Sequence, residues 1–164
     1  MDDDTGEGQE LTLTYYPNRS MNPYTCTDFT NRVVFSLLYQ GLFSVDRSYQ
    51  AEPMLCKQYS VSPDLRSYSF SLESATFSDG SVLTASDVVA SLKQAKDSGF
   101  YAGRFSNVKS ITEADDGAVQ IVLTTPYENF PILLDVPIVK ASQLTAARPL
   151  GTGPYQYEEA DANL

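Results

Sequence analysis

A strict alternation of side chains in one short segment is the strongest constraint that this sequence places on its fold. Every second residue from Tyr68 to Leu72 is aromatic or aliphatic, and serine occupies the positions between them. This period of two predicts a β-strand with one buried face and one hydrated face. The segment Gln58–Ser62 lies just before a Pro63-Asp64 turn and is the predicted neighbouring strand. We therefore expect a β-hairpin here.

Further strands are predicted by turn residues and by the same alternation. Val108–Ala114 and Val119–Thr125 flank Gly117, which supplies the positive backbone angle of a tight hairpin. Leu11–Tyr16 shows the period of two expected of a strand with one buried face. A last strand is expected at Tyr155–Glu159.

Helical periodicity occurs between these strands. From Asn31 onward the apolar residues recur in the i, i+1, i+4, i+5 pattern of one helical face, and Gly41 is a suitable C-terminal cap. Thr84-Ala85-Ser86-Asp87 resembles a capping box at the start of a second helix. One or two helical turns are expected within Asn129–Leu134. Together these elements predict an α+β fold: a mixed, largely antiparallel sheet with a few helices.

The composition excludes several classes of function. The 164-residue chain carries 11 Lys and Arg against 21 Asp and Glu, a net charge of −10 that would repel a phosphate backbone, so nucleic acid is not an expected partner. Histidine is absent, which removes the usual general base and a common zinc ligand. We therefore expect no enzymatic activity, no metal site and no cofactor. No base lies beside a serine or cysteine that could activate it in a hydrolase.

Three motifs in fixed order carry a resemblance to a known family. They are Leu38-Tyr39-Gln40-Gly41-Leu42-Phe43, then Phe77-Ser78-Asp79-Gly80-Ser81 with Leu83-Thr84-Ala85-Ser86-Asp87-Val88, then Gly151-Thr152-Gly153-Pro154-Tyr155. At this spacing the chain resembles the family 5 solute-binding proteins, which serve oligopeptide, dipeptide and nickel importers. The alternative for the individual motifs is a scaffold role, since turn and cap chemistry accounts for them and glycine permits a close backbone approach.

The resemblance implies a part of a two-lobed, periplasmic-binding-protein-like fold. By analogy, residues 11–34 and 148–164 would be strands of lobe I, and residues 35–147 would be an inserted α+β subdomain. The second lobe is expected to be absent from this chain. Residues 1–10 are interpreted as a disordered acidic spacer behind an export signal that this sequence lacks.

The resemblance also implies a function. The chain would belong to the substrate-binding component of an ABC importer, which captures peptides outside the membrane and delivers them to the permease. It would be extracytoplasmic, with a lipid anchor on the outer face of the bacterial cytoplasmic membrane. The alternatives are another solute, such as a nickel complex, a sugar or an opine, and a surface or sensory domain without transport. Exposed sheet edges would allow such a chain to form a dimer.

Two segments are candidate ligand-binding sites. Thr27, Asp28 and Phe29 lie in a segment that resembles the loop lining the family's ligand cleft, and the alternative is an ordinary polar loop. Tyr101 follows the capped helix where some oligopeptide binders place a cleft-facing tyrosine. Its alternative is packing in the core with Phe105 and its neighbours.

The chain has two cysteines, Cys26 and Cys56. An exported compartment would permit a disulfide between them. The alternative for Cys56 is a small buried residue in a position where the family often has alanine.

Overall fold

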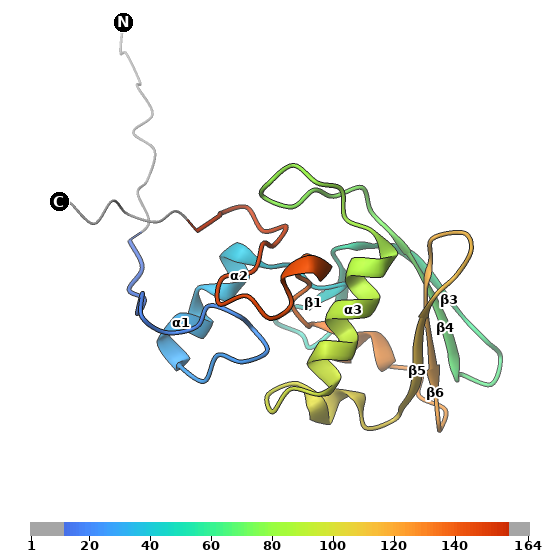
Figure 1. Ribbon diagram of the computed structural model, residues 1–164. Helices are drawn as coiled ribbons and strands as arrows, with labels where there is room; N and C mark the ends of the chain where they lie inside the picture. Colours follow the sequence, from blue (N-terminus) through green and yellow to red (C-terminus); the bar gives the residue numbers. More distant parts are fainter. Residues whose placement is uncertain (1–11, 158–164) are drawn as a thin grey trace, which may run out of the picture.

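The computed structural model describes residues 12–157 (Figure 1). The predicted spacer at 1–10 lies outside the described residues. The described chain forms two antiparallel sheets, one long helix and several short helical segments, which confirms the α+β prediction. Among the helices of this described part, none is long and apolar enough to cross a membrane.

The larger sheet contains four antiparallel strands. In spatial order these are β3 (Cys56–Val61), β4 (Ser67–Leu72), β6 (Val119–Leu123) and β5 (Val108–Glu113). Both predicted hairpins are confirmed, since β3 pairs with β4 and β5 pairs with β6. The aromatic side chains of β4 face the core, with Tyr68 and Phe70 2% and 0% exposed. Gly117 has the expected positive φ of 80° in the β5–β6 turn.

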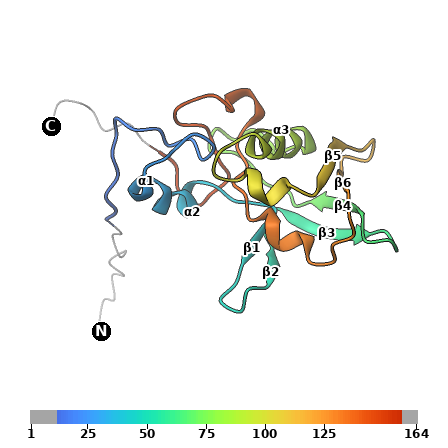
Figure 2. The ribbon, with the colours of Figure 1, turned by 90° about the horizontal axis from the view of Figure 1, so that it is seen from below.

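Helix α3 (Ala85–Lys96) packs against β5 and β6 through its apolar stripe (Figure 2). The predicted capping box is present: Thr84 accepts from the Asp87 amide, and the Asp87 carboxylate accepts from the Thr84 amide at 2.9 Å. The other oxygen of Asp87 accepts from the backbone amide of Ala141 at 2.9 Å. One carboxylate therefore caps the helix and also fixes the segment that follows Val139.

A smaller hairpin joins β1 (Phe43–Val45) to β2 (Ala51–Pro53). The sequence analysis did not predict it, because strands of three residues are too short to show an alternation. Phe43 is buried and lies edge-on to Phe70, with 5.9 Å between the ring centroids. Three 3-10 segments follow, namely η1 (Ala102–Phe105), η2 (Phe130–Leu134) and η3 (Ala141–Gln143). The helical turn expected within 129–134 is thus confirmed.

The helix predicted from Asn31 is interrupted. The chain forms α1 (Phe29–Val33) and α2 (Phe35–Leu38), which meet at Val34. Gly41 is not the cap, because the helix ends at Tyr39, whose backbone is extended. Instead, a Cβ atom on Gly41 would lie 2.9 Å from the carbonyl oxygen of Val136. Gly41 is needed because two backbone segments cross there.

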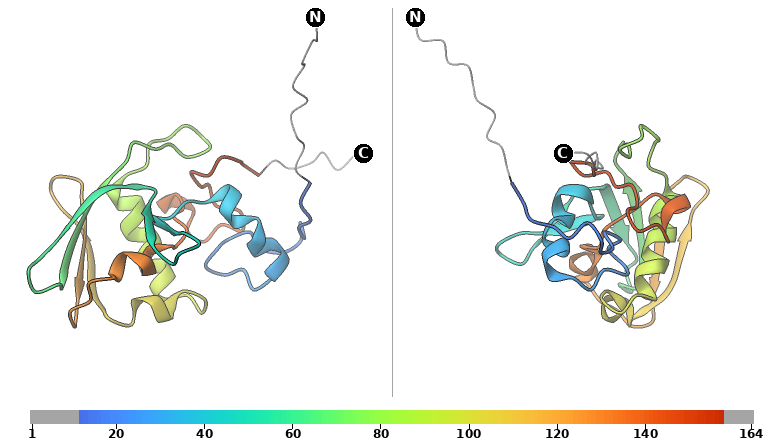
Figure 3. Two further views of the ribbon diagram at one scale, coloured as in Figure 1. Left: turned by 180° about the vertical axis from the view of Figure 1, so that it is seen from behind. Right: turned by 60° about the vertical axis from the view of Figure 1, so that its left-hand side comes forward.

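The terminal strands expected at 11–16 and 155–159 are not formed in their described parts, 12–16 and 155–157. No neighbouring strand pairs with either segment there, and an alternating pattern alone cannot satisfy backbone hydrogen bonds. The two segments nevertheless come together on the side of the molecule away from the four-stranded sheet (Figure 3). Tyr15 and Tyr157 lie edge-on, with ring centroids 5.8 Å apart.

The segment that follows Leu150 crosses the end of α2 at very short range. The amide of Gly153 donates to the Leu38 carbonyl at 3.0 Å, and the amide of Tyr155 donates to the Leu37 carbonyl at 3.0 Å. A Cβ atom on Gly153 would lie 2.3 Å from the Leu37 oxygen. The close backbone approach expected of this glycine motif is confirmed.

We predict that Gly153→Ala destabilises the protein by about 1–3 kcal/mol or more, the usual cost of forcing extra atoms into a packed site. The obstacle is the Leu37 carbonyl, a backbone atom that cannot rotate away. Urea or thermal unfolding measures the loss. Gly103→Ala is the matched control, since a Cβ atom there would meet nothing within 4 Å. Equal stability of the two variants would contradict the crossing.

Candidate functional site

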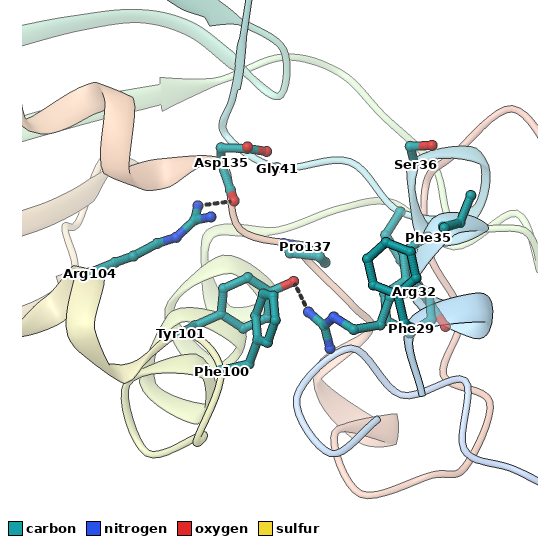
Figure 4. Close-up of a pocket in the computed structure, with 12 residues that line it drawn as sticks. Phe29, Arg32, Phe35, Ser36, Gly41, Phe100, Tyr101, Arg104, Asp135 and Pro137 are labelled. Carbon is teal, nitrogen blue, oxygen red and sulfur yellow. Dashed lines mark hydrogen bonds between the residues drawn. The ribbon is translucent and has the colours of Figure 1, made fainter. Parts of the chain in front are cut away.

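Two adjoining hollows lie between the N-terminal part of the chain and the connection from α3 to η1. The first has a volume of about 390 Å³ and the second about 480 Å³. Both are lined by Phe29, Arg32 and Phe100, and we call the two hollows together the α1 groove. Figure 4 shows the first hollow. The rim of the groove is exposed to solvent, because Phe29 and Phe100 are 81% and 60% exposed.

Arg32 of α1 holds the groove together. Its Nη1 donates to the carbonyl oxygens of Pro23 and Cys26 at 3.1 and 2.9 Å, and its Nη2 donates to the Tyr101 hydroxyl at 2.9 Å (Figure 4). The guanidinium carbon lies 3.4 Å from the centroid of the Phe100 ring. The planar, multidentate guanidinium suits this arrangement of ring and oxygen atoms. Arg32 thereby links α1, the preceding loop and the η1 region.

Tyr101 lies beneath the rim, 5% exposed, and lines the first hollow. The guanidinium carbons of Arg32 and Arg104 each lie 5.4 Å from its ring centroid. Burial raises the pKa of the Tyr101 hydroxyl above its ordinary value of 10.0, and the two guanidinium groups oppose this shift only in part. The hydroxyl is therefore neutral near pH 7 and can donate a hydrogen bond.

The structure brings three of the four predicted ligand-binding residues to the groove. Phe29 lines both hollows, Thr27 lines the second, and Tyr101 lines the first. Tyr101 fits both alternatives considered for it, a groove-lining residue and a core residue, since it lines the groove and is also buried. Phe105 is a core residue at 1% exposure. That these residues bind a ligand stays a prediction.

Asp28, the fourth predicted residue, has a structural role at the start of α1. Its Oδ1 accepts from the Asn31 amide at 3.1 Å and so caps α1, and its Oδ2 pairs with Arg19 at 2.9 Å. Asp28 is not among the residues that line either hollow. The loop alternative considered for this segment therefore describes Asp28 better than it describes its two neighbours.

Sequence reasoning missed Arg32, Phe100 and Arg104. Arg32 precedes Val33 and Val34, the apolar pair that suggested the helix, and an arginine in that position is usually an ordinary solvated residue. Its contacts reach backbone carbonyls 9 and 6 residues away and a hydroxyl 69 residues away. No local pattern encodes such contacts.

The possible disulfide between Cys26 and Cys56 is not formed in the structure. Cys26 and Cys56 are both buried and free. Each thiol contacts a carbonyl oxygen two residues further along the chain, that of Asp28 at 3.5 Å and that of Gln58 at 3.4 Å. Cys26 lies in the loop before α1 and Cys56 begins β3, so each fits the alternative of a small buried side chain. Within residues 12–157 no group of three or more His, Cys, Asp or Glu side chains is placed to hold a metal ion.

Comparison with known proteins identifies the family of this chain. The family described as bacterial extracellular solute-binding proteins, family 5 Middle, matches residues 50–163. The glutathione-binding protein GsiB of Escherichia coli is 32% identical over 152 residues, which cover 85% of this chain and 30% of GsiB. The chain therefore belongs to the bacterial extracellular solute-binding proteins. Within that class it is a member of family 5.

Solved structures agree with this assignment. The structure of AgaA from A. tumefaciens in complex with agropinic acid matches with a TM-score of 0.76 at 26% identity, covering 87% of this chain and 32% of AgaA. The oligopeptide-binding protein AppA of Bacillus subtilis, solved with a nonapeptide, matches with a TM-score of 0.70 at 22% identity, covering 87% of this chain and 32% of AppA. The likeness to AppA shows the fold alone. The chain spans about a third of the length of these proteins.

We predict that both cysteines react with a thiol reagent in the unfolded protein and that neither reacts quickly in the native protein. Both side chains are buried, and burial raises the pKa of the Cys56 thiol from 9.0 to about 11. The thiolate is the reactive form, so little of it exists near pH 7. Mass spectrometry after alkylation without reductant counts the labelled thiols. Two labels in denaturant confirm free thiols, and no label there would indicate a bridge.

Proposed function

We propose that this chain is part of the substrate-binding component of an ABC importer that captures peptides outside the membrane and delivers them to a membrane permease. The observation that carries the proposal is the α1 groove in a family 5 solute-binding protein. The groove combines exposed aromatic rims at Phe29 and Phe100 with the hydrogen-bonded pair of the half-buried Arg32 and the buried Tyr101. Ligand sites commonly pair apolar walls with a few fixed polar groups.

The groove suits a peptide in particular. Peptides offer apolar side chains as well as backbone carbonyl and amide groups. The ring of a buried tyrosine can pack on the side chains, and its hydroxyl can hydrogen-bond to the backbone groups. GsiB, the 32% identical relative, is named for binding glutathione, which is a tripeptide. We propose no catalytic step, because the groove's lining residues hold no paired nucleophile and base.

A different solute is the second candidate. AgaA was solved with agropinic acid and NikZ from Campylobacter jejuni with Ni(L-His), and their TM-scores are 0.76 and 0.71. An opine or a chelated metal therefore remains compatible with the scaffold. A surface or sensory domain that no longer serves transport is a third candidate, and a gene for an adjoining regulator rather than a permease would favour it.

The domain division is part of the proposal. Residues 11–34 and 148–164 would belong to lobe I, with 35–147 as the inserted subdomain and a second lobe outside this chain. The contact between Tyr15 and Tyr157 supports it, since the two segments are adjacent in space. Closure of the two lobes about a hinge between them would enclose the ligand.

The remaining partners follow from the same proposal. A lipid anchor would hold the protein at the outer face of the cytoplasmic membrane, next to the permease. Self-association would use the outer strands of the larger sheet, β3 and β5, whose outward edges no described strand covers. Light scattering at rising protein concentration tests the dimer.

We predict that the protein binds di- to pentapeptides and that Phe29→Ala weakens this binding by about tenfold, the effect of removing a moderate aromatic contact. The unfolding free energy should change by less than about 0.5 kcal/mol, because the side chain is 81% exposed. Calorimetry is done with the longest reading frame that contains this sequence and with glutathione and mixed peptides.

Tyr49→Ala is the matched control, because Tyr49 is 77% exposed and lies in the β1–β2 turn, outside both hollows. It should leave binding unchanged. Absence of binding by every peptide mixture, with binding of opines or nickel complexes instead, would replace the first candidate by the second. Equal losses in the two variants would remove the α1 groove from the site.

A further inference from the structure

The two outer strands of the larger sheet, β3 and β5, have edges of different character. No described strand pairs with the outward side of either one. In β3 every residue after Cys56 is exposed, and the stretch from Gln58 to Val61 contains no charged residue and no proline. Proteins usually protect an exposed sheet edge with charges, prolines or a covering helix. This stretch of β3 lacks such protection against pairing with another strand.

The hydrogen bonds of the β3–β4 hairpin show which backbone groups of β3 point outward. The amide of Ser62 donates to the Ser67 carbonyl at 2.9 Å, so the backbone of Ser62 points toward β4. Backbone direction alternates along an antiparallel strand. Ser60 therefore also points toward β4, and the N–H and C=O groups of Tyr59 and Val61 point toward the open side.

The side chains of these two residues extend the core as far as this edge. Tyr59 is paired with the buried Phe70, so its side chain is on the core face, and Val61 shares that face two residues later. The Tyr59 ring centroid lies 5.7 Å from those of Phe43 and Phe70. Even so, Tyr59 and Val61 are 46% and 39% exposed. Outward backbone groups and incompletely buried apolar side chains thus occur at the same two residues.

The edge of β5 is better protected. The amide of Ala114 donates to the Ala118 carbonyl at 2.9 Å, so the backbone of the preceding residue, Glu113, points outward. Lys109 and Glu113 place exposed charges near the two ends of the strand. Ile111 between them is already buried, and α3 packs against this strand and not against β3 (Figure 2). Pairing at β5 would therefore bury little further apolar surface.

The open part of the β3 edge is complementary to a second copy of itself. When two copies pair antiparallel with Ser60 of each at the symmetry axis, Tyr59 of one copy lies opposite Val61 of the other, and this pair occurs twice. The backbone groups of both residues face the second copy, so each pair can exchange two hydrogen bonds. An aromatic and a β-branched side chain opposite one another stabilise a sheet, and all four lie on one face.

The charges near the edge also suit a second copy. In the same register, Lys57 of one copy comes level with Pro63 and Asp64 of the other, so the exposed charges at each end of the contact have opposite signs. The contact is short, because the Cys56 amide already donates to the Leu42 carbonyl at 3.2 Å and closes the edge before Lys57.

We propose that two copies of this protein associate through β3, antiparallel about a twofold axis at Ser60, so that their larger sheets join into one continuous sheet. The inference rests on the self-association included in the proposed function, and it names the edge, the register and the symmetry. It does not depend on the identity of the ligand, because β3 contributes no residue to either hollow of the α1 groove. The short contact predicts a dimer that forms only as the protein concentration rises.

The first experiment measures the dimer dissociation constant by sedimentation of the longest reading frame that contains this sequence. Raised salt is used, because two copies of this sequence, each of net charge −10, repel one another and salt screens the repulsion. Val61→Pro removes one outward N–H group from each copy, a change that edge strands tolerate. The dissociation constant should rise about tenfold or more, as for two lost hydrogen bonds.

Glu113→Pro is the matched control. Glu113 is the last residue of β5, as Val61 is the last residue of β3, and both are exposed with outward amides. The control should leave the dissociation constant unchanged. Thermal unfolding of each variant checks that it is folded.

A second experiment tests the register with a cysteine at the axis. Ser60 of the two copies would form a non-hydrogen-bonded pair with Cα atoms about 4.5 Å apart, a separation that a disulfide can span. Mild oxidation of Ser60→Cys should therefore cross-link the dimer. Gln58→Cys is the control on the same face, since the two copies of residue 58 would lie roughly 13 Å apart along the strands. The native cysteines are buried and should not contribute.

The outcomes are distinct. Absence of a dimer at every concentration overturns the inference, and so does a dimer that Glu113→Pro weakens at least as much as Val61→Pro, or one that neither variant weakens. Cross-linking of Gln58→Cys in place of Ser60→Cys overturns the register. Peptide binding is measured on the same samples by calorimetry. A monomer that binds peptides leaves peptide capture standing, whereas a dimer that binds none contradicts peptide capture and leaves this contact intact.

Discussion

The close crossing of backbone segments is the constraint on which the rest of this structure depends. Gly151 and Gly153 lie against the carbonyl groups that end α2, and Gly41 lies against Val136. At each of these places a single Cβ atom would overlap a backbone atom, which cannot move aside as the end of a flexible side chain can. The crossings attach the two short N-terminal helices to the body that contains both sheets. Because α1 carries Phe29 and Arg32, the position of one wall of the groove is set by glycines far from it in sequence.

Arg32 then connects the segments that these crossings bring together. Its guanidinium joins three segments by donating to two carbonyl groups and one hydroxyl, none of which carries a charge. Arg19, by contrast, pairs with a carboxylate at the start of the same helix. Hydrogen bonds to neutral oxygens stabilise the guanidinium without neutralising it, so its field extends into the groove. The arrangement fixes the geometry of the site and leaves its charge available.

The sequence predicted correctly those features that depend on residues close together in the chain, and it did not predict those that depend on distant residues. Both hairpins of the larger sheet and the capping box of α3 depend on residues close together in sequence, and alternation, turn residues and cap spacing revealed them. The prediction of terminal strands was wrong for their described parts. Alternation at Leu13 and Tyr15 shows that a strand there could bury one face, but it does not show that a neighbouring strand is present. Gly41 was assigned to a local cap, although its cause is the distant Val136. Family resemblance directed attention to Phe29 and Tyr101, whereas Arg32 could not be found without the fold that brings Tyr101 to it.

The comparisons limit what the fold alone can say about the ligand. Structures of the same fold were solved with agropinic acid, with a nickel–histidine complex and with a nonapeptide. A scaffold that accommodates such different molecules does not determine the ligand, so its chemistry must come from particular side chains. In this chain the rim of the groove is aromatic, at Phe29 and Phe100, and its lining includes the hydrogen-bonded polar pair of Arg32 and Tyr101. Apolar walls discriminate weakly and buried polar groups discriminate strongly, because an unmatched polar group loses its hydrogen bonds to water. If the groove binds a ligand as proposed, its selectivity would depend on Tyr101 and Arg32 more than on the larger aromatic surface around them.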